Sequence, residues 1–316
     1  EERSARSEYE WASQVGLEAS EVAGDRPVTG LACLGGRDGA VVTGGWDGNV
    51  KLWERDAEAG LKVKPSRTLG EEEERVTCVR AMNGLVLACG TGVAGSVYRC
   101  RAGDGDDFAP AERVELRGHK MRLGRAAFHP QGEYALTTSH DRTMRMWSLS
   151  TGQEVLLQDG HFSAAHGLAV HKEGSLVCST DFGGVSLIWD LRTGKKIQHF
   201  QGHSGRVLAC DFAPDGFSLA TGGDDGSVKI WDLRTKSMRS TAPAHRRLIS
   251  TLEYSASGES ILTASYDGTM RVLSARDSSK IRVLEGHDGR VCAGAWGERE
   301  IWSVGGDGTL KLWRGN

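Results

Sequence analysis

Short runs of alternating hydrophobic and polar residues recur along the chain. Clear examples are RVLACDFA from Arg206, FSLATGG from Phe217 and SVKIWDL from Ser227. A period of two residues predicts β-strands, because successive side chains of a strand point to opposite faces. The chain has 43 glycines among 316 residues and no low-complexity run. This pattern predicts an all-β protein with many short strands joined by tight turns.

Three columns of residues repeat through the chain at steps of 40 to 47 residues. The first column is Asp25, Glu72, His119, His161, His203, His245 and His287. The second column, in the turn before a strand, is Asp47, Ala94, Asp141, Gly183, Asp225, Asp267 and Asp307. The third column, six residues further on, is Trp53, Cys100, Trp147, Trp189, Trp231, Leu273 and Trp313. Three columns that agree predict seven copies of one structural unit.

The spacing, the Gly-His pairs and the Trp-Asp pairs resemble the WD-repeat family, in which each repeat forms a four-stranded blade. One blade cannot bury both of its faces alone, so blades stack around an axis. The expected fold is an all-β, seven-bladed β-propeller over residues 17–316, with residues 1–16 as a short helical lead-in or tail outside the ring. Since no strand follows Trp313, we expect residues 17–23 to complete the seventh blade.

A buried hydrogen-bond chain is expected within the repeats. A histidine, a serine or threonine, an aspartate and a tryptophan N–H can form such a chain, which stabilises a turn when every member is satisfied. Only the third repeat offers a full set in these columns, and we expect the second repeat, which lacks every member, to be the loosest. The expected network is His119, Ser139, Asp141 and Trp147.

Motifs that could carry chemistry have structural explanations. Residues 90–95 spell GxGxxG, but an alternating run follows where a dinucleotide site needs a helix. His161, His166 and His171 are five residues apart and fall on alternate faces of strands, so they do not form a metal site. We therefore expect no enzyme activity, catalytic residue, cofactor, metal or small-molecule substrate.

Charge and composition restrict the class of protein. The formal net charge of −3 disfavours nucleic-acid binding over the whole surface and leaves a local basic face open. No run of 18 apolar residues is present, so no membrane-spanning helix is expected. The seven cysteines contain no CxxC pair, which is typical of reduced thiols in an intracellular protein.

One face of the expected propeller combines arginines with flat rings. Three residues after the first column come Val28, Arg75, Arg122, Ala164, Arg206, Leu248 and Arg290, at the start of each innermost strand. Directly before the second column come Trp46, Val93, His140, Phe182, Asp224, Tyr266 and Gly306. Arginine and aromatic residues anchor protein interfaces and also suit RNA. We expect this face to bind partners, with Trp46 exposed; the alternative is an ordinary solvated rim.

Several stretches resemble one particular group of WD-repeat proteins. GDRPV from Gly24, GHKMRLGRAAFHPQGEYALTTSHDRTMRMW from Gly118 and TAPAH from Thr241 resemble the processing-factor-four family, the WD-repeat components of the U4/U6 small nuclear ribonucleoprotein. This resemblance implies a nuclear scaffold of pre-mRNA splicing that docks the U4/U6-associated processing factor three and contacts neighbouring U4/U6 snRNA.

Two other functions stay open. The tetrapeptide Trp-Asp-Leu-Arg occurs at residues 189–192 and 231–234. It resembles the adaptor-docking motif of WD-repeat substrate receptors of cullin-ring ubiquitin ligases, although Trp-Asp-Leu is common in this fold. The remaining alternative is a generic scaffold.

Overall fold

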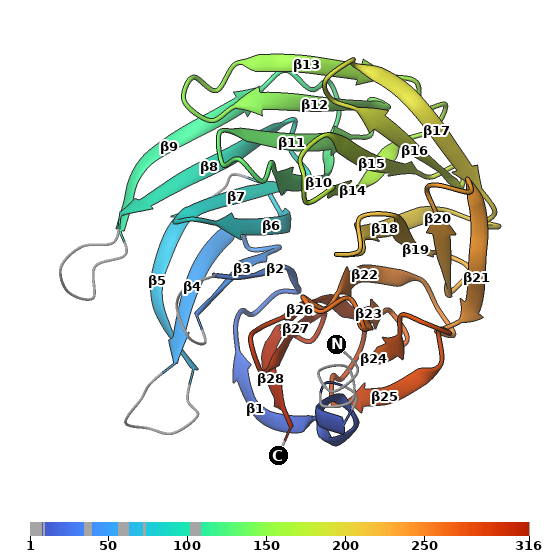
Figure 1. Cartoon of the computed structure of the whole chain (residues 1–316). Helices are drawn as coiled ribbons and strands as arrows, with labels where there is room; N and C mark the ends of the chain where they lie inside the picture. The colour runs from blue at the N-terminus through green and yellow to red at the C-terminus, as the bar shows by residue number, and fades with distance from the viewer. Residues whose placement is uncertain are drawn as a thin grey trace.

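The computed structural model describes residues 8, 10–34, 40–55, 63–71, 74–101 and 109–315. In this part of the chain, 28 strands form seven four-stranded sheets, β1–β28, and every adjacent pair within a sheet is antiparallel. The sheets are arranged as blades around one axis (Figure 1). The seven-bladed β-propeller expected from the repeats is confirmed.

Each blade runs from an inner strand at the axis to an outer strand. Blade one is β2 (Val28–Cys33), β3 (Val41–Gly45), β4 (Asn49–Arg55) and β5 (Val63–Glu71). Blade two is β6 (Val76–Met82), β7 (Leu85–Gly90), β8 (Ala94–Arg101) and β9 (Ala109–Arg117). Blade three is β10 (Leu123–Phe128), β11 (Tyr134–Ser139), β12 (Thr143–Ser148) and β13 (Glu154–Asp159).

The remaining blades follow the same plan. Blade four is β14 (Ala165–Val170), β15 (Leu176–Asp181), β16 (Val185–Asp190) and β17 (Lys195–Gln201). Blade five is β18 (Val207–Phe212), β19 (Ser218–Gly223), β20 (Ser227–Asp232) and β21 (Ser237–Pro243). Blade six is β22 (Ile249–Tyr254), β23 (Ser260–Ser265), β24 (Thr269–Ser274) and β25 (Lys280–Glu285). Blade seven is β26 (Val291–Trp296), β27 (Ile301–Gly305), β28 (Thr309–Arg314) and β1 (Gly16–Val22).

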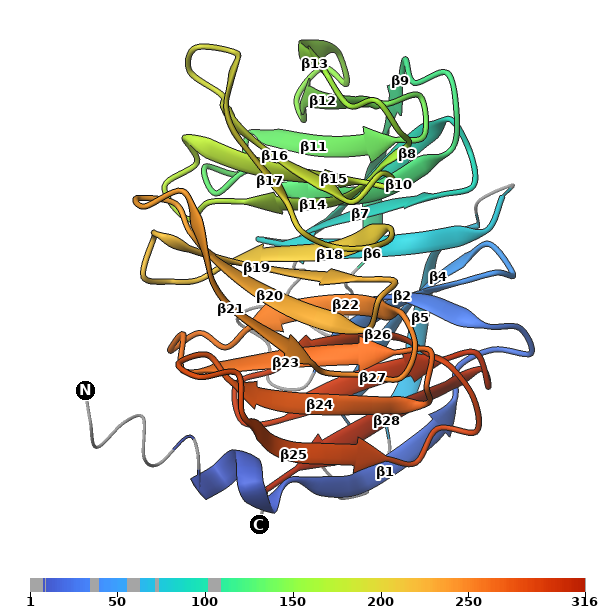
Figure 2. The same ribbon diagram turned by 90° about the vertical axis from the view of Figure 1, so that its right-hand side faces the viewer.

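The two ends of the described chain close the ring. Strand β1 pairs antiparallel with β28, with Leu17 opposite Trp313 and Val22 opposite Thr309. Both views show β1 beside β28 (Figures 1 and 2). The expected closing strand is therefore confirmed, and it supplies the outer strand that blade seven otherwise lacks.

Residues 10–15, directly before β1, pack against the ring. Residues 10–14 are helical (Figure 2), and the Ala12 and Val15 side chains have no exposed surface among residues of blades six and seven. The Trp11 ring lies 6.2 Å from the Trp296 ring, and Arg282 Nε donates to the Val15 carbonyl at 3.1 Å. Burial of these apolar side chains explains why the lead-in contacts the sheets.

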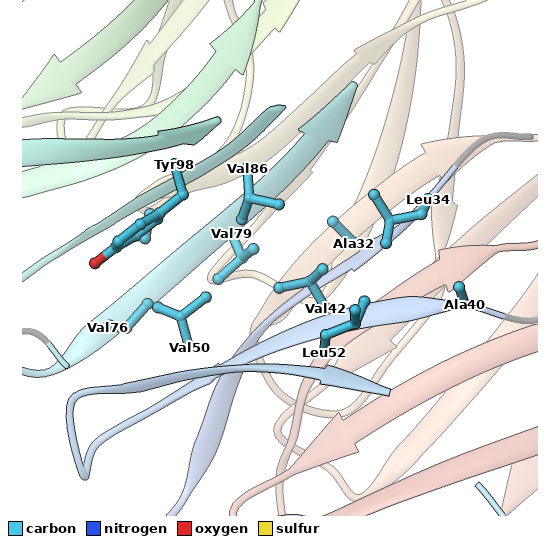
Figure 3. Packing of buried hydrophobic residues seen from close by; sticks show 11 residues of the cluster. Ala32, Leu34, Ala40, Val42, Val50, Leu52, Val76, Val79, Val86 and Tyr98 are labelled. Atoms are coloured by element: carbon cyan, nitrogen blue, oxygen red, sulfur yellow. The ribbon is translucent and has the colours of Figure 1, made fainter. Parts of the chain in front are cut away.

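The hydrophobic core lies between the blades. Figure 3 shows Val42 and Val50 of blade one facing Val79 and Val86 of blade two, and all four are almost fully buried. Clusters of this kind occupy each of the seven junctions between neighbouring blades. Each sheet therefore buries both faces through its neighbours, which is why the ring has to be closed.

Blade two differs from the expected columns by two residues. Its β6–β7 turn is the pair Asn83-Gly84, with φ of 48° and 76°, typical of a tight two-residue hairpin. The register then sets Tyr98 opposite Val86, as Trp53 stands opposite Val41 in blade one. The third-column residue of this blade is thus Tyr98, which is buried, and the second-column residue is Gly92; Cys100 and Ala94 were wrong.

Candidate functional site

The buried network of blade three runs through Thr137. The His119 Nδ1 lies 2.8 Å from Asp141 Oδ2, and its Nε2 lies 2.8 Å from Thr137 Oγ1. Trp147 Nε1 donates to the same threonine oxygen at 2.8 Å. The expected member Ser139 shares its hydroxyl hydrogen between two backbone carbonyls of the loop before β10 and accepts from the Asp141 backbone N–H at 3.1 Å, without meeting either ring. The expectation that Ser139 links the histidine and the tryptophan was therefore wrong, because the hydroxyl that meets both rings lies two residues earlier on β11.

The same connection occurs in other blades, so the expectation of a single full set was also wrong. Complete chains are His161–Asp181–Ser179–Trp189, His203–Asp225–Thr221–Trp231 and His287–Asp307–Ser303–Trp313. Blade six keeps His245, Thr263 and Asp267, with Leu273 in place of the tryptophan. In blade four the acid is Asp181 and not the second-column residue Gly183, which donates its backbone N–H to Asp181.

Protonation in this network follows from burial. Burial lowers the pKa of His119, although the hydrogen bond to Asp141 raises it, and the net effect favours the neutral ring. A neutral ring that donates from Nδ1 to Asp141 accepts at Nε2 from the Thr137 hydroxyl. The Thr137 oxygen is then free to accept from Trp147. Every group is satisfied inside the blade, so the network is structural and presents no reactive group.

A ring of backbone hydrogen bonds defines the rim of the arginine face. The turn between the second and third strands of each blade donates one N–H to the carbonyl just before the inner strand. The donors are Trp46, Thr91, His140, Phe182, Asp224, Tyr266 and Gly306. The acceptors are Pro27, Arg75, Arg122, Ala164, Arg206, Leu248 and Arg290. Pro27 is the acceptor where Val28 was expected, and Thr91 is the donor where Val93 was expected. The four expected arginines and the four expected rings, Trp46, His140, Phe182 and Tyr266, all lie on this rim.

The first of two clusters on the rim, the Trp46 cluster, comprises Arg75, Trp46, Arg290 and Tyr266. The Arg75 and Arg290 guanidinium carbons lie 4.5 and 4.8 Å from the centre of the Trp46 ring. Arg290 also lies 5.3 Å from the Tyr266 ring. Trp46 is half-buried, so the expectation of an exposed ring was wrong. Two guanidinium groups from neighbouring blades cover it through cation–π contacts.

The second, the Phe182 cluster, comprises Arg122, His140, Phe182 and Arg206. Arg122 Nε lies 3.0 Å from His140 Nδ1, and the His140 ring lies 4.9 Å from the Phe182 ring. Arg206 lies 5.4 Å from the Phe182 ring and donates from Nε to Asp224 at 2.8 Å. Burial, with the charge of Arg122, lowers the pKa of His140 to about 4. The neutral His140 ring accepts the Arg122 hydrogen bond.

The two Trp-Asp-Leu-Arg segments lie at the opposite end of the blades. Arg234 packs 3.8 Å from the Phe217 ring, and its Nη2 lies 2.9 Å from Asp232. Arg192 lies 3.8 Å from Asp190, and its side chain is 85% exposed. Each arginine thus pairs with the aspartate of its own segment, and that of Arg192 is the more accessible.

Other candidate chemistry is accounted for within the described ranges. Residues 90–95 cover the end of strand β7, the β7–β8 turn and the start of strand β8, with no helix after them. In the described residues, no group of three or more His, Cys, Asp or Glu side chains could hold a metal ion. Cys33, Cys78, Cys89, Cys178, Cys210 and Cys292 are unbonded thiols, and the Cys100 side chain lies outside the described part. Among the described residues, no helix has the length and apolarity needed to cross a bilayer.

Comparisons with known proteins agree with the repeat structure. The chain is 28% identical over 157 residues to the U4/U6 small nuclear ribonucleoprotein PRP4 of Saccharomyces cerevisiae, covering 50% of this chain and 33% of that protein. It is 34% identical over 94 residues to a guanine nucleotide-binding protein subunit beta of Oryza sativa subsp. indica, covering 29% and 24%. An uncharacterised WD repeat-containing protein of Schizosaccharomyces pombe is 34% identical over 140 residues, covering 43% and 29%.

These matches span a third or less of each relative, so they relate the repeats and not the whole proteins. The family model for the WD domain, G-beta repeat, matches residues 21–54, 112–148, 194–232, 236–274 and 278–314, more than half of the chain. Together with the seven blades, this match shows that the chain belongs to the WD domain, G-beta repeat family.

Proposed function

We propose that this chain is a non-catalytic scaffold that docks protein partners on the arginine rim, the surface formed by the Trp46 cluster and the Phe182 cluster. One observation carries the proposal: each of the four rim arginines contacts a ring in its own or a neighbouring blade. Side chains held in this way lose less conformational entropy on binding, which favours affinity. Arginine beside aromatic residues is also the usual composition of interface anchors.

The partners we propose are proteins of the U4/U6 particle, processing factor three foremost, together with U4/U6 snRNA, in the nucleus. Support comes from the similarity to the U4/U6 small nuclear ribonucleoprotein PRP4 over half of the chain. The stretches GDRPV, from Gly24, and TAPAH, from Thr241, add to this support because they are less generic than the Gly-His and Trp-Asp marks of the repeat.

Charge reversal on the rim tests the proposal. In Arg122→Glu/Arg206→Glu, retention of processing factor three and of U4 and U6 RNA should fall at least tenfold in a pull-down. The melting temperature should stay close to the parent value, because exposed charges contribute only about 0–1 kcal/mol to stability. The matched control is Arg192→Glu/Arg234→Glu on the opposite face, which should retain the partners.

A ubiquitin-ligase receptor is the second candidate, favoured by the accessible Arg192. If the Arg192→Glu/Arg234→Glu variant loses its main partner while the rim variant keeps it, the splicing proposal is wrong and the receptor takes its place. Direct RNA contact has its own test: affinity should fall steeply with added salt, because binding RNA releases counterions. A protein partner would give a shallower dependence.

A further inference from the structure

A cavity of about 300 Å³ opens at the centre of the arginine rim, where the inner strands begin. Three arginines and two histidines line it, and no Asp or Glu belongs to its described lining. These five residues are Arg122, Arg125, Arg206, His140 and His166. Arg206 pairs with Asp224 outside the lining, but Arg122 and Arg125 have no carboxylate partner among the described residues. A partly open space lined by guanidinium groups and no carboxylate has a positive potential, which favours an anion.

Arg125 forms part of this cavity and joins three blades. From β10 in blade three, its Nη1 donates to the Thr77 carbonyl of blade two at 3.1 Å. Its Nη2 donates to the Ser250 carbonyl of blade six at 2.8 Å. Both partners are neutral, and no ion pair to Arg125 is present within the described ranges. The guanidinium charge is therefore fixed in place and left without a compensating carboxylate.

His166 supplies a polar atom without a partner. This residue lies on β14 and lines the cavity, and its buried Nδ1 has no hydrogen bond to any described residue. Burial lowers the pKa of His166 well below its ordinary value, and the charges of Arg125, His140, Arg122 and Arg206 lower it further. Buried polar groups are normally paired, so an unpaired ring nitrogen beside guanidinium groups indicates space for a ligand.

The size of the cavity and the charge around it restrict the ligand. A volume of about 300 Å³ lies at the small end of the range for ligand pockets, so the cavity can receive a side chain and its terminal group but not a folded domain. Outside the cavity, the same face exposes acidic side chains beside basic ones. The acidic ones include Asp47, Glu74 and Asp288, and the basic ones include Lys120, Arg246 and Arg247. A single anionic group can enter the cavity and avoid these acidic side chains, which favours one side chain of a peptide as its occupant.

We propose that this cavity is an oxyanion pocket that receives one side-chain carboxylate or phosphate of a peptide docked on the arginine rim. The free guanidinium nitrogens of Arg122 and Arg206 would bind the oxyanion by charge-assisted hydrogen bonds, and His166 would donate the third. The proposal rests on the proposed function only in that the peptide belongs to a protein partner of the rim.

Peptide titrations on the full chain test the pocket. The probes are a glycine–glutamate repeat peptide, its glycine–glutamine and glycine–phosphoserine counterparts, inorganic phosphate and a uridine-rich RNA, followed by calorimetry. Glutamate or phosphoserine peptides should bind at least tenfold more tightly than the glutamine peptide. Inorganic phosphate should compete for the same site. Equal affinity for glutamate and glutamine peptides would overturn the proposal, as would RNA competing more strongly than either peptide.

His166→Leu is the decisive variant, because it removes the ring nitrogen and breaks no hydrogen bond of Nδ1. Affinity for the anionic peptides should fall about tenfold, equivalent to about 1.4 kcal/mol, without a change in melting temperature. The matched control is His199→Leu on the exposed outer strand β17, which should bind like the parent. Unchanged affinity in His166→Leu would exclude this residue as a ligand and overturn the pocket.

The pocket and the docking function can fail separately. If the rim variant Arg122→Glu/Arg206→Glu loses processing factor three but His166→Leu keeps peptide affinity, the rim stands and the pocket is wrong. If His166→Leu loses affinity for the peptide while that rim variant keeps the partner, the oxyanion pocket is supported and the docking surface for the partner lies elsewhere.

Discussion

One threonine hydroxyl holds the buried network of blade three together, because both Trp147 and His119 bond to it. Thr137→Val keeps the shape of the side chain and removes that hydroxyl. The buried indole N–H and imidazole nitrogen then both lose a partner, which should lower the free energy of unfolding by about 1–3 kcal/mol. Urea denaturation of parent and variant would measure the change.

Thr43→Val in blade one is the matched control for Thr137→Val. Thr43 Oγ1 accepts from Trp53 Nε1 at 2.8 Å, and the first-column residue of this repeat is Asp25 and not a histidine. The loss of unfolding free energy should therefore be smaller in Thr43→Val. Equal losses at Thr43 and Thr137 would contradict the idea that the histidine link stabilises the blade.

At the residue scale, the sequence predicted the members of the network better than its connections. His119, Asp141 and Trp147 follow from the columns, and the structure joins them. The sequence could not show whether Ser139 or Thr137 bonds to the two rings, because both carry a hydroxyl and both lie on the same face of β11. The pairing register decides: Thr137 stands opposite Arg145, two residues from Trp147, and so reaches the indole.

At the element scale, a single turn explains why the columns failed in blade two. The Asn83-Gly84 pair is a recognised hairpin signal, yet a constant 47-residue step left no place for a shorter blade. Recognising that turn would have moved the expected position from Cys100 to Tyr98. The contacts of residues 10–15 could not be predicted, since they depend on where β1 joins β28 around the ring.

A deletion can test directly whether the propeller needs strand β1 to close the ring. Deleting residues 1–24 removes the outer strand of blade seven and leaves the edge of β28 unpaired. Exposed strand edges promote aggregation, and the buried Ala12 and Val15 are lost as well. We expect lower solubility and a large fall in melting temperature by differential scanning fluorimetry.

The control for that deletion removes residues 1–7 and keeps residues 10–14 and β1 in place. It should melt close to the parent temperature. A deletion of residues 1–24 that stayed soluble and melted like the parent would show that the ring does not depend on β1.

At the scale of the molecule, the rim shows what repeats can and cannot predict. Spacing alone identified Arg75, Arg122, Arg206 and Arg290, because a shared repeat position places residues at one end of the ring. The same repeat spacing could not predict which side chains surround Trp46. Its two guanidinium partners come from blades two and seven, which neighbour blade one only because the ring is closed.

Acidic pH should act on the whole ring through its buried histidines. Burial lowers the pKa of His119, His203, His245 and His287 below the ordinary value of 6.5 in the folded protein, despite the aspartate beside each ring. The unfolded chain therefore binds more protons as the pH falls through 6.5. The stabilisation is fully present above that pH and is lost as the pH drops below it.

Two buried carboxyls, Asp211 and Glu253, act in the opposite direction, because burial raises the pKa of each. Asp211 is removed from the measurement by substitution, because its pKa falls within the measured range. Burial raises the pKa of Asp211 to about 7, although the hydrogen bond from the Tyr254 N–H lowers it. The folded state then keeps a proton that the unfolded carboxyl releases, so this residue reduces stability as the pH rises toward 7. Asp211→Asn keeps an acceptor for Tyr254 and removes the titration.

In the Asp211→Asn background, the melting temperature should fall steadily between pH 7.5 and pH 5.5. Protonation of four buried rings favours the unfolded chain throughout this window, and each ring belongs to a different blade, so the losses should add. Adding His203→Asn should lower the melting temperature at pH 7.5 and make the acid-dependent decline shallower. A melting temperature that stays constant or rises toward pH 5.5 would show that the histidines are already charged in the folded protein, with the aspartates stabilising imidazolium and not the neutral ring.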